Sequence, residues 1–205
     1  HQKGFIEGNA WNYSLFVPHN PEGLFSLMGG KERMLAYLDS LFDFNLPDKY
    51  FEHTEDITRE GIIGNYVHGN EPSHHVAYLY HFTSSPRKTQ ERIRQIMDTM
   101  YKPRPDGLCG NDDCGQMSAW YIFNALGFYP MAPGSDKYYF GLPIVEKAVI
   151  SLPGGKQLSI ETHHPKSGSS FVERIELNGK PVQTPYITHS EILNGGKLDY
   201  YFGER

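Results

Sequence analysis

The sequence predicts a mainly α chain that ends in a small antiparallel β module. Through the first 140 residues, apolar side chains recur at the three- and four-residue spacing of helices. Near Phe140 the pattern changes to β-type alternation with turn signals. We therefore expect two parts, residues 1–140 and residues 141–205, with no internal repeat.

Four segments of the first part are expected to be helical. In the first of them, Met34, Leu38 and Leu41 share one face. Pro72 is a suitable first residue for another helix, because proline lacks the N–H that the first turn leaves unpaired. The predicted helices are residues 30–44, a segment opening at Pro72, residues 86–101 and residues 115–126, the last ended by Gly127.

The second part reads as five or six short strands joined by tight turns. Pro153-Gly154-Gly155 separates two alternating runs and predicts a hairpin. Asn178-Gly179 is the strongest two-residue hairpin signal in the chain. The predicted strands are residues 148–152, 157–162, 171–177, 186–188 and 197–202.

Composition excludes several classes of protein. The net charge is −5 and no basic stripe is present, so nucleic acid is not an expected partner. No apolar run has the length of a membrane-spanning helix. Because the chain opens at His1-Gln2-Lys3 without a leader, we expect a processed chain or a piece of a longer one. Cys109 and Cys114 could be reduced thiols, a local disulfide or metal ligands.

Three polar, glycine-containing segments carry the candidate chemistry. The first motif is residues 7–13, the second motif is residues 68–75, and the third motif is residues 107–121. Each combines carboxylates, amides or imidazoles with nearby aromatic residues, and Tyr and Phe are abundant at 14 and 12 residues. An acidic pocket lined by aromatic rings and amides is typical of a site that binds and cleaves sugars.

Each motif also has a structural interpretation. Asp112 and Asp113 precede a predicted helix, so they could supply a general base or simply cap the helix. Glu7 could be an acid whose pKa is raised by burial beside Trp11, or it could be an exposed glutamate. A Ser-His-Asp triad is compatible with the composition, but no G-x-S-x-G segment supports it.

The second motif leaves similar alternatives open. Asn70 and Glu71 offer the oxygen atoms that a hard cation such as calcium prefers. His74 and His75 are adjacent and lack the i, i+4 spacing of a zinc site. They could instead pack within the core behind a helix that opens at Pro72.

Taken together, the runs Glu7 to Trp11, His68 to His75 and Gly107 to Tyr121 resemble glycoside hydrolase family 92. The run Asn124 to Pro130 continues the resemblance, which extends over nearly the whole chain. The resemblance implies an inverting, calcium-dependent exo-α-mannosidase that removes terminal mannose, α-1,2-linked for example, from glycans such as N-glycans.

The resemblance also implies an architecture. The chain would be the second half of an (α/α)6 barrel followed by the closing β segment, with an N-terminal β-sandwich domain as its partner in the whole enzyme. Half a barrel would expose apolar flanks, so we expect the isolated piece to be inactive or to self-associate. A periplasmic or secreted bacterial location is implied.

Roles for single residues follow from the same resemblance. Glu7 would be the catalytic acid and Asp113 the catalytic base, about 6.5–9.5 Å apart as inversion requires, with Asp112 assisting. The residues expected to contact the sugar are Asn9, Trp11, His68 and Asn111, and those expected to hold calcium are Asn70 and Glu71. The alternative is a carbohydrate-binding or scaffold module without catalysis, which would not need Glu7 opposite Asp113.

Overall fold

The computed structural model describes residues 5, 7–45, 47, 49, 59–164 and 168–204. The chain divides into two compact units, an N-terminal unit of His1–Tyr121 and a C-terminal unit of Ile122–Arg205. This division falls within helix α5 (Gln116–Leu126). It lies before the change in sequence pattern near Phe140, where we expected the boundary. Each unit is described below by itself.

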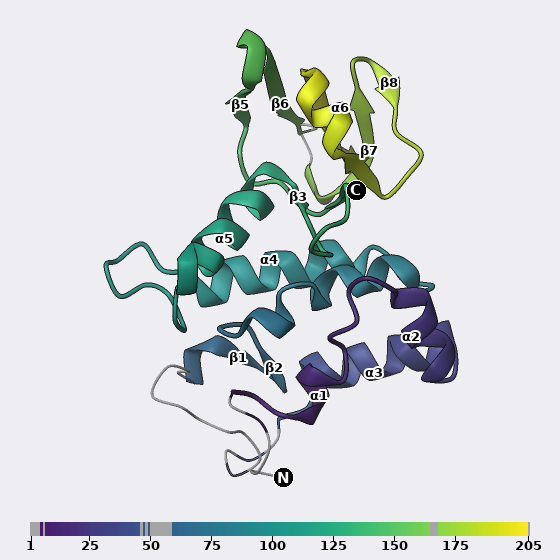
Figure 1. Ribbon diagram of the computed structural model, residues 1–205, viewed down its shortest axis with the longest axis vertical. Helices are drawn as coiled ribbons and strands as arrows, with labels where there is room; N and C mark the ends of the chain where they lie inside the picture. The colour runs from purple at the N-terminus through teal and green to yellow at the C-terminus, as the bar shows by residue number, and fades with distance from the viewer. Residues whose placement is uncertain are drawn as a thin grey trace. The chain divides into compact units, whose positions relative to one another are not determined.

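The N-terminal unit is built from α-helices joined by short 3₁₀ helices. Helices α2 and α3 pack side by side (Figure 1). The α-helices are α1 (Ala10–Tyr13), α2 (Pro21–Leu27), α3 (Lys31–Asp43), α4 (Lys88–Met100) and the first part of α5 (Gln116–Leu126). The 3₁₀ helices are η2 (Arg59–Gly61), η3 (Glu71–Ser73), η4 (Val76–Phe82) and η5 (Asp113–Gly115).

The predicted apolar stripes form the core of this unit. On α3, Met34, Leu38 and Leu41 are fully buried, as the helical spacing predicted. On α4, Ile93 and Ile96 are likewise fully buried. The helices predicted at residues 30–44, 86–101 and 115–126 are thus confirmed to within one or two residues at each end.

The segment after Pro72 differs from the single α-helix that we predicted. It forms two 3₁₀ helices, η3 and η4, separated at His74 and His75. Residues 76–80 are all fully buried, because η4 is contacted by α2, α3 and α4. A helix enclosed in this way has no solvent-facing side, and its sequence therefore lacks the polar stripe by which a surface helix is recognised.

A small antiparallel pair, β1 (Ile62–Ile63) and β2 (Tyr66–Val67), was not predicted from the sequence. The two strands are joined by Gly64 and Asn65. Gly64 has φ +60° and lies against α3, where a Cβ atom would come within 2.4 Å of the Phe42 carbonyl oxygen. Only glycine fits this turn, which fixes the pair beside the end of α3.

The C-terminal unit contains a five-stranded and a three-stranded sheet. The order is β5-β6-β10-β7-β8 in the first sheet and β3-β4-β9 in the second. The strands are β3 (Phe128–Tyr129), β4 (Lys137–Phe140), β5 (Lys147–Ser151), β6 (Gln157–His163), β7 (Gly168–Leu177), β8 (Lys180–Pro181), β9 (Tyr186–Thr188) and β10 (Gly196–Glu204). Helix α6 (His189–Asn194) begins with a capping box between Thr188 and Glu191.

Both predicted hairpin turns are confirmed. Strands β7 and β8 pair at Leu177 and Lys180 around Asn178 and Gly179, whose φ angles are 53° and 74°. Two consecutive left-handed residues are what a type I′ turn requires. Residues Pro153–Gly155 join the antiparallel strands β5 and β6.

The predicted fold class was wrong. The chain is not mainly α, because strands build two sheets of the C-terminal unit and a third small sheet lies in the N-terminal unit. The β part is also not purely antiparallel, since β10 runs parallel to β6. The long connection through β7, β8, β9 and α6 allows this parallel pairing, and strand alternation in a sequence does not report strand direction.

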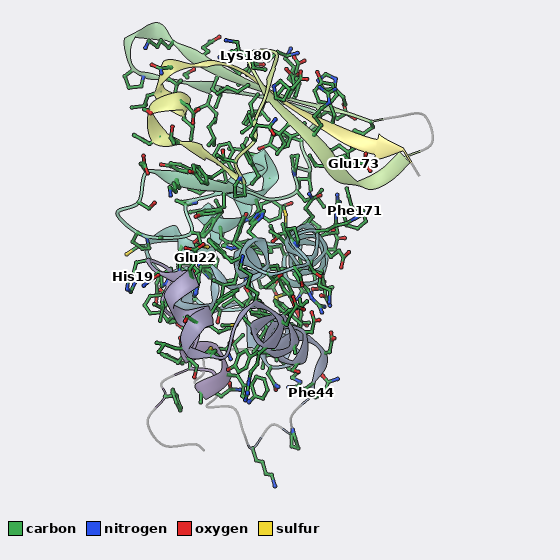
Figure 2. All side chains as sticks on the ribbon, turned by 90° about the vertical axis from the view of Figure 1, so that its right-hand side faces the viewer. His19, Glu22, Phe44, Phe171, Glu173 and Lys180 are labelled. Atoms are coloured by element: carbon green, nitrogen blue, oxygen red, sulfur yellow. The ribbon has the colours of Figure 1, made fainter. Side chains whose placement is uncertain are left out.

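The surface carries several large apolar side chains. Figure 2 shows Phe44 just beyond the end of α3, where 57% of the residue is exposed, and His19 and Glu22 near the start of α2. Leu27 at the end of α2 is 89% exposed. Self-association through such side chains stays a prediction. Among the described residues, no helix is long and apolar enough to cross a membrane.

Candidate active site

The three motifs meet within the N-terminal unit. The first motif contacts the second through the side chains of Asn12 and Asn70. The second contacts the third through the backbones of Gly69 and Gly110. Segments that are about sixty and forty residues apart along the chain are thereby held at one place, as a shared site requires.

Asn12 is the main connection between the first and second motifs. Its side chain is buried and makes four hydrogen bonds. Oδ1 accepts from the Val67 N–H at 3.0 Å and from the Ser73 hydroxyl at 3.1 Å. Nδ2 donates to the Asn65 carbonyl at 2.8 Å and to Asn9 Oδ1 at 3.2 Å. All four bonding positions of the amide are used, so α1 is fixed against β2 and η3.

Asn70 makes a second connection. Its Nδ2 donates to the Tyr13 hydroxyl at 3.1 Å and to the Glu7 carbonyl oxygen at 3.4 Å. The residue is only 7% exposed. Its Oδ1 receives no hydrogen bond from the described residues. Asn70 therefore has its amide nitrogen held by the first motif, while its amide oxygen is unpaired among the described residues.

The second and third motifs pack backbone against backbone. A Cβ atom on Gly110 would lie 2.7 Å from the Gly69 Cα, and one on Gly69 would lie 3.1 Å from the Gly110 Cα. Beside this crossing, a Cβ atom on Gly61 would lie 2.8 Å from the Cys109 carbonyl oxygen. The three glycines allow a separation between the motifs that no other residue permits.

Gln116 reinforces this crossing from the start of α5. Its Nε2 donates to the Asn111 carbonyl at 2.8 Å and makes a long 3.5 Å contact with the Gly69 carbonyl. Its Oε1 is buried and has no hydrogen-bond partner among the described residues. The side chain therefore spans both motifs at their closest approach.

His68 is fully buried with both ring nitrogens occupied. The Tyr101 hydroxyl donates to the Met117 carbonyl at 3.1 Å, so it accepts from His68 Nε2 at 2.7 Å. The Tyr66 hydroxyl, 2.8 Å from Nδ1, must then be the donor to that nitrogen. Burial holds the pKa of His68 well below its usual value, so the ring is neutral. His68 presents no free nitrogen to a sugar here and instead ties the second motif to α5.

The other two histidines of the second motif are also structural. His74 Nε2 donates to the His68 carbonyl at 3.0 Å, and His75 Nε2 donates to the Leu15 carbonyl at 2.7 Å. The Trp120 indole N–H donates to the His74 carbonyl at 3.0 Å. Burial lowers the pKa of His74 and of His75 to about 4. Of the two interpretations of this pair, the structure favours packing within the core.

Asp112 is occupied by the start of α5. Its Oδ1 accepts from the backbone N–H groups of Met117 and Ser118 at 2.9 and 3.0 Å, and its Oδ2 accepts from the Ser118 hydroxyl at 2.7 Å. These bonds, with that of the Ser118 hydroxyl foremost, lower the pKa of Asp112. The carboxylate thus caps the helix, as one of the two sequence interpretations proposed.

Asp113 is placed differently from its neighbour. It is exposed, and its carboxylate makes no hydrogen bond or ion pair with the described residues. Cys114 and Gly115 follow with φ angles of 54° and 79°, so the chain turns sharply between Asp113 and α5. A non-glycine residue held in the left-handed region costs on the order of 1 kcal/mol and is a feature of functional loops. Neither cysteine forms a disulfide: Cys114 is exposed, and Cys109 is buried, which raises the pKa of its thiol to about 11.

The remaining predicted site residues belong to these motifs and differ in how exposed they are. Asn9 is buried and caps α1 by accepting from the Trp11 N–H at 2.9 Å, while its Nδ2 has no partner among the described residues. Trp11 is half-buried and stacks on Tyr37 of α3, with ring centroids 4.7 Å apart. Glu7 is half-buried, and Glu71 and Asn111 are exposed.

Three connecting residues were not among the predicted site residues, namely Asn12, Tyr13 and Gln116. All three lie inside the motifs that the sequence singled out. The signal that could have found Asn12 and Gln116 is the presence of uncharged amides in otherwise carboxylate-rich turns, where an amide can both donate and accept. The single hydroxyl contact of Tyr13 has no comparable signal.

The C-terminal unit holds a second cluster of polar residues. Ligand-type atoms of Glu161, His163 and Asp199 lie within 4.8 Å of one another. The Lys197 ammonium lies 2.7 Å from Glu161 Oε2 and 2.9 Å from Asp199 Oδ1. Lys147 lies 2.9 Å from Glu161 Oε1. Two lysines already neutralise these carboxylates, so the cluster acts as an ion-pair network across β5, β6 and β10.

Comparison with known families shows what the chain is similar to. The glycosyl hydrolase family 92 catalytic domain matches residues 1–204 of the chain. A curated relative from Arthroderma benhamiae, named an uncharacterized secreted glycosidase, is 30% identical over 97% of this chain and 24% of its own length.

Solved structures of the same family are also similar to this chain. A family GH92 α-mannosidase of Bacteroides thetaiotaomicron in complex with mannoimidazole is 41% identical, with a TM-score of 0.87 over 97% of this chain and 26% of its own. An inverting mannosidase of the same family and organism is 37% identical, with a TM-score of 0.79 over 98% of this chain and 28% of its own. The chain thus spans about a quarter of the length of these relatives.

The glycine crossing gives a first prediction. Gly110→Ala should lower the free energy of unfolding by about 1–3 kcal/mol, because its Cβ would meet backbone that cannot move aside. Gly154→Ala is the matched control, since Gly154 has φ +75° and no atom within 4 Å of its Cβ position. The control variant should therefore lose stability only through the strain of placing alanine in a left-handed conformation. Denaturant unfolding of both variants measures the difference, and unchanged stability of Gly110→Ala would contradict the crossing.

The buried histidines give a second prediction. The pKa of His74 and of His75 is about 4 in the folded chain and about 6.5 when unfolded. The unfolded state therefore binds more protons between these values. The free energy of unfolding should be fully retained above about pH 6.5 and should fall by a few kcal/mol as the pH drops toward 4.

Variants separate this effect from other acid effects. Gln can donate to a carbonyl without titrating, so His74→Gln with His75→Gln should flatten the loss of stability between pH 6.5 and pH 4. Denaturant unfolding at a series of pH values measures both slopes. A slope that is identical in the wild type and the double variant would show that these histidines do not titrate on unfolding.

Proposed function

The chain belongs to glycosyl hydrolase family 92, and we propose that its three motifs form part of the site at which an α-mannosidase removes terminal α-linked mannose from glycans. N-glycans with α-1,2-linked mannose are the substrates we propose. The observation that carries the proposal is the meeting of the three motifs, which brings the exposed Asp113 on the third motif and Glu7 on the first motif into one region. Since the chain spans about a quarter of its relatives, this activity is proposed for the naturally expressed protein.

Asp113 is the better candidate for the general base. A base must have an unoccupied oxygen to take a proton from water. The three side-chain hydrogen bonds of Asp112 all go to Met117 and Ser118 of α5. The carboxylate of Asp113, in contrast, is exposed and unpaired among the described residues. Asp112 then assists as a positioning residue, because its capping bonds hold the turn on which Asp113 stands.

Glu7 is the candidate for the general acid. It is half-buried at the start of the first motif, and an acid must be placed where it can reach the glycosidic oxygen. Its backbone carbonyl is 3.4 Å from Asn70 Nδ2, which connects it to the second motif. The Asn12 bonds then hold α1, and with it the Glu7 segment, against β2 and η3.

These two residues would perform an inverting hydrolysis. Glu7 donates its proton to the glycosidic oxygen as the bond between that oxygen and the anomeric carbon breaks. Asp113 takes a proton from a water molecule whose oxygen forms the new bond at the opposite face of the sugar. The α-mannoside yields β-mannose, and the carboxyl groups should lie about 6.5–9.5 Å apart to admit the water.

Asn70 and Glu71 are the candidate calcium ligands. The amide oxygen of Asn70 is unpaired among the described residues, while its nitrogen donates to the Tyr13 hydroxyl. The Glu71 carboxylate is exposed on the next residue. Both are the hard oxygen donors that calcium takes. When bound, calcium would supply positive charge that grips sugar hydroxyls.

The other residues predicted to contact the sugar fall into an accessible pair and a buried pair. Trp11 and Asn111 are accessible enough to touch a sugar, Trp11 with its ring and Asn111 with its amide. His68 and Asn9 are buried, and we propose that they position the motifs instead. Secretion is proposed because the curated relative is named a secreted glycosidase.

Substitution of the two carboxylates tests the mechanism. Glu7→Gln and Asp113→Asn should each lower kcat for an α-1,2-mannobioside roughly 100- to 10,000-fold while mannose binding persists, because proton transfer is lost and shape is kept. Asp112→Asn should lower kcat less, since an amide oxygen can still cap α5. Turnover close to wild type in both Glu7→Gln and Asp113→Asn would favour a carbohydrate-binding module without catalysis.

Removal of calcium tests the metal proposal. A chelator should abolish mannoside hydrolysis, and added calcium should restore it, because the sugar loses the cation that holds its hydroxyls. Glu71→Gln should raise the calcium concentration needed for half-maximal activity by about tenfold or more, since a carboxylate is replaced by a neutral amide. Hydrolysis that is unaffected by the chelator would rule out the cation.

A further inference from the structure

Asn70 is useful as a ligand only if its amide has one orientation. An amide carries a donor at one end and an acceptor at the other, and rotation by 180° about the last side-chain bond exchanges them. A cation beside the acceptor would be repelled by the donor. What decides the orientation is therefore what the nitrogen contacts.

Two acceptors hold the nitrogen of Asn70. The Tyr13 hydroxyl oxygen is at 3.1 Å and the Glu7 carbonyl oxygen is at 3.4 Å. The shorter bond goes to Tyr13, and 3.4 Å is beyond the usual range for an N–H···O bond. Because Nδ2 donates to Tyr13, Oδ1 lies on the other side of the planar amide, where it accepts no hydrogen bond from the described residues.

Tyr13 is itself held in place. It is the last residue of α1, which Asn9 caps and which Asn12 fixes to β2 and η3. Its half-buried ring lies against Phe5, with centroids 5.2 Å apart. A hydroxyl carried on such a support is a fixed acceptor for Asn70.

We propose that Tyr13 is a positioning residue whose hydroxyl orients the Asn70 amide so that Oδ1 faces the bound cation. This inference rests on the proposed calcium role of Asn70. Partners that orient a metal ligand typically change metal affinity by about 10- to 100-fold when they are removed. Tyr13 would act on calcium affinity without touching calcium.

The test is the calcium affinity of Tyr13→Phe, measured with calcium chloride alone by isothermal titration calorimetry on the naturally expressed protein. Phe keeps the ring and removes only the hydroxyl. The dissociation constant should rise about tenfold. Hydrolysis of an α-mannobioside should be restored by raising the calcium concentration in proportion.

Tyr37→Phe is the matched control. Tyr37 also donates its hydroxyl to the first motif, at 3.1 Å from the Trp11 carbonyl, but it does not contact Asn70. Both variants lose one tyrosine hydrogen bond to the same segment. If only general loosening of α1 mattered, the two variants would weaken calcium binding equally, and that result would overturn the proposal.

A second background isolates the orientation effect. In Asn70→Asp the two carboxylate oxygens are equivalent, so there is no amide orientation to fix. Tyr13→Phe should then change the calcium dissociation constant by less than about twofold, and the double-mutant cycle should show coupling between the two positions. An equal effect of Tyr13→Phe in both backgrounds would overturn the orientation role.

The outcomes also separate this inference from the function on which it rests. If the wild-type protein binds no calcium, the calcium proposal fails and the role of Tyr13 fails with it. If the wild type binds calcium and Tyr13→Phe binds it equally well, only the role of Tyr13 is overturned.

Discussion

Gly69 and Gly110 pack with no side chain between them, and this contact sets the distance between the second and third motifs. Gly61 extends the same contact to the Cys109 carbonyl. Everything that we propose for catalysis depends on this separation. The second motif contacts both of the others, so an acid on the first motif and a base on the third can act on one sugar only if the motifs pack closely. Glycine loses more conformational entropy on folding than other residues. At these positions it allows the two backbones to approach more closely than alanine would.

Several polar side chains around this crossing are used to hold the three motifs together. Asn12 uses all its bonding positions within the protein, and His68 is neutral with both nitrogens occupied. Asp112 is committed to the start of α5. Asp113, one residue later, is left free by a left-handed turn at Cys114. Adjacent residues of the same type thus have different surroundings, because the Asp112 carboxylate bonds the start of α5 and the Asp113 carboxylate is exposed.

The sequence predicted features that depend on local pattern. The stripes on α3 and α4, the Asn178-Gly179 turn and the three motifs follow from residue spacing and turn chemistry. Features that depend on distant pairing were missed, such as the parallel alignment of β10 with β6 and the short pair β1–β2. For the site, the motifs could be located, but the capping role of Asp112 could not be chosen from spacing, since a base and a cap fit the same residue. The burial of His68, which was predicted to contact the sugar, depends on contacts with Tyr66 and Tyr101 that spacing does not report.

The most direct test is a crystal structure of the naturally expressed protein with calcium and a mannose-like inhibitor. The account predicts that the inhibitor contacts all three motifs, with the carboxyl carbons of Glu7 and Asp113 on opposite faces of the sugar ring and about 6.5–9.5 Å apart. An inhibitor bound away from these motifs, or carboxyl groups separated by more than about 12 Å, would contradict it.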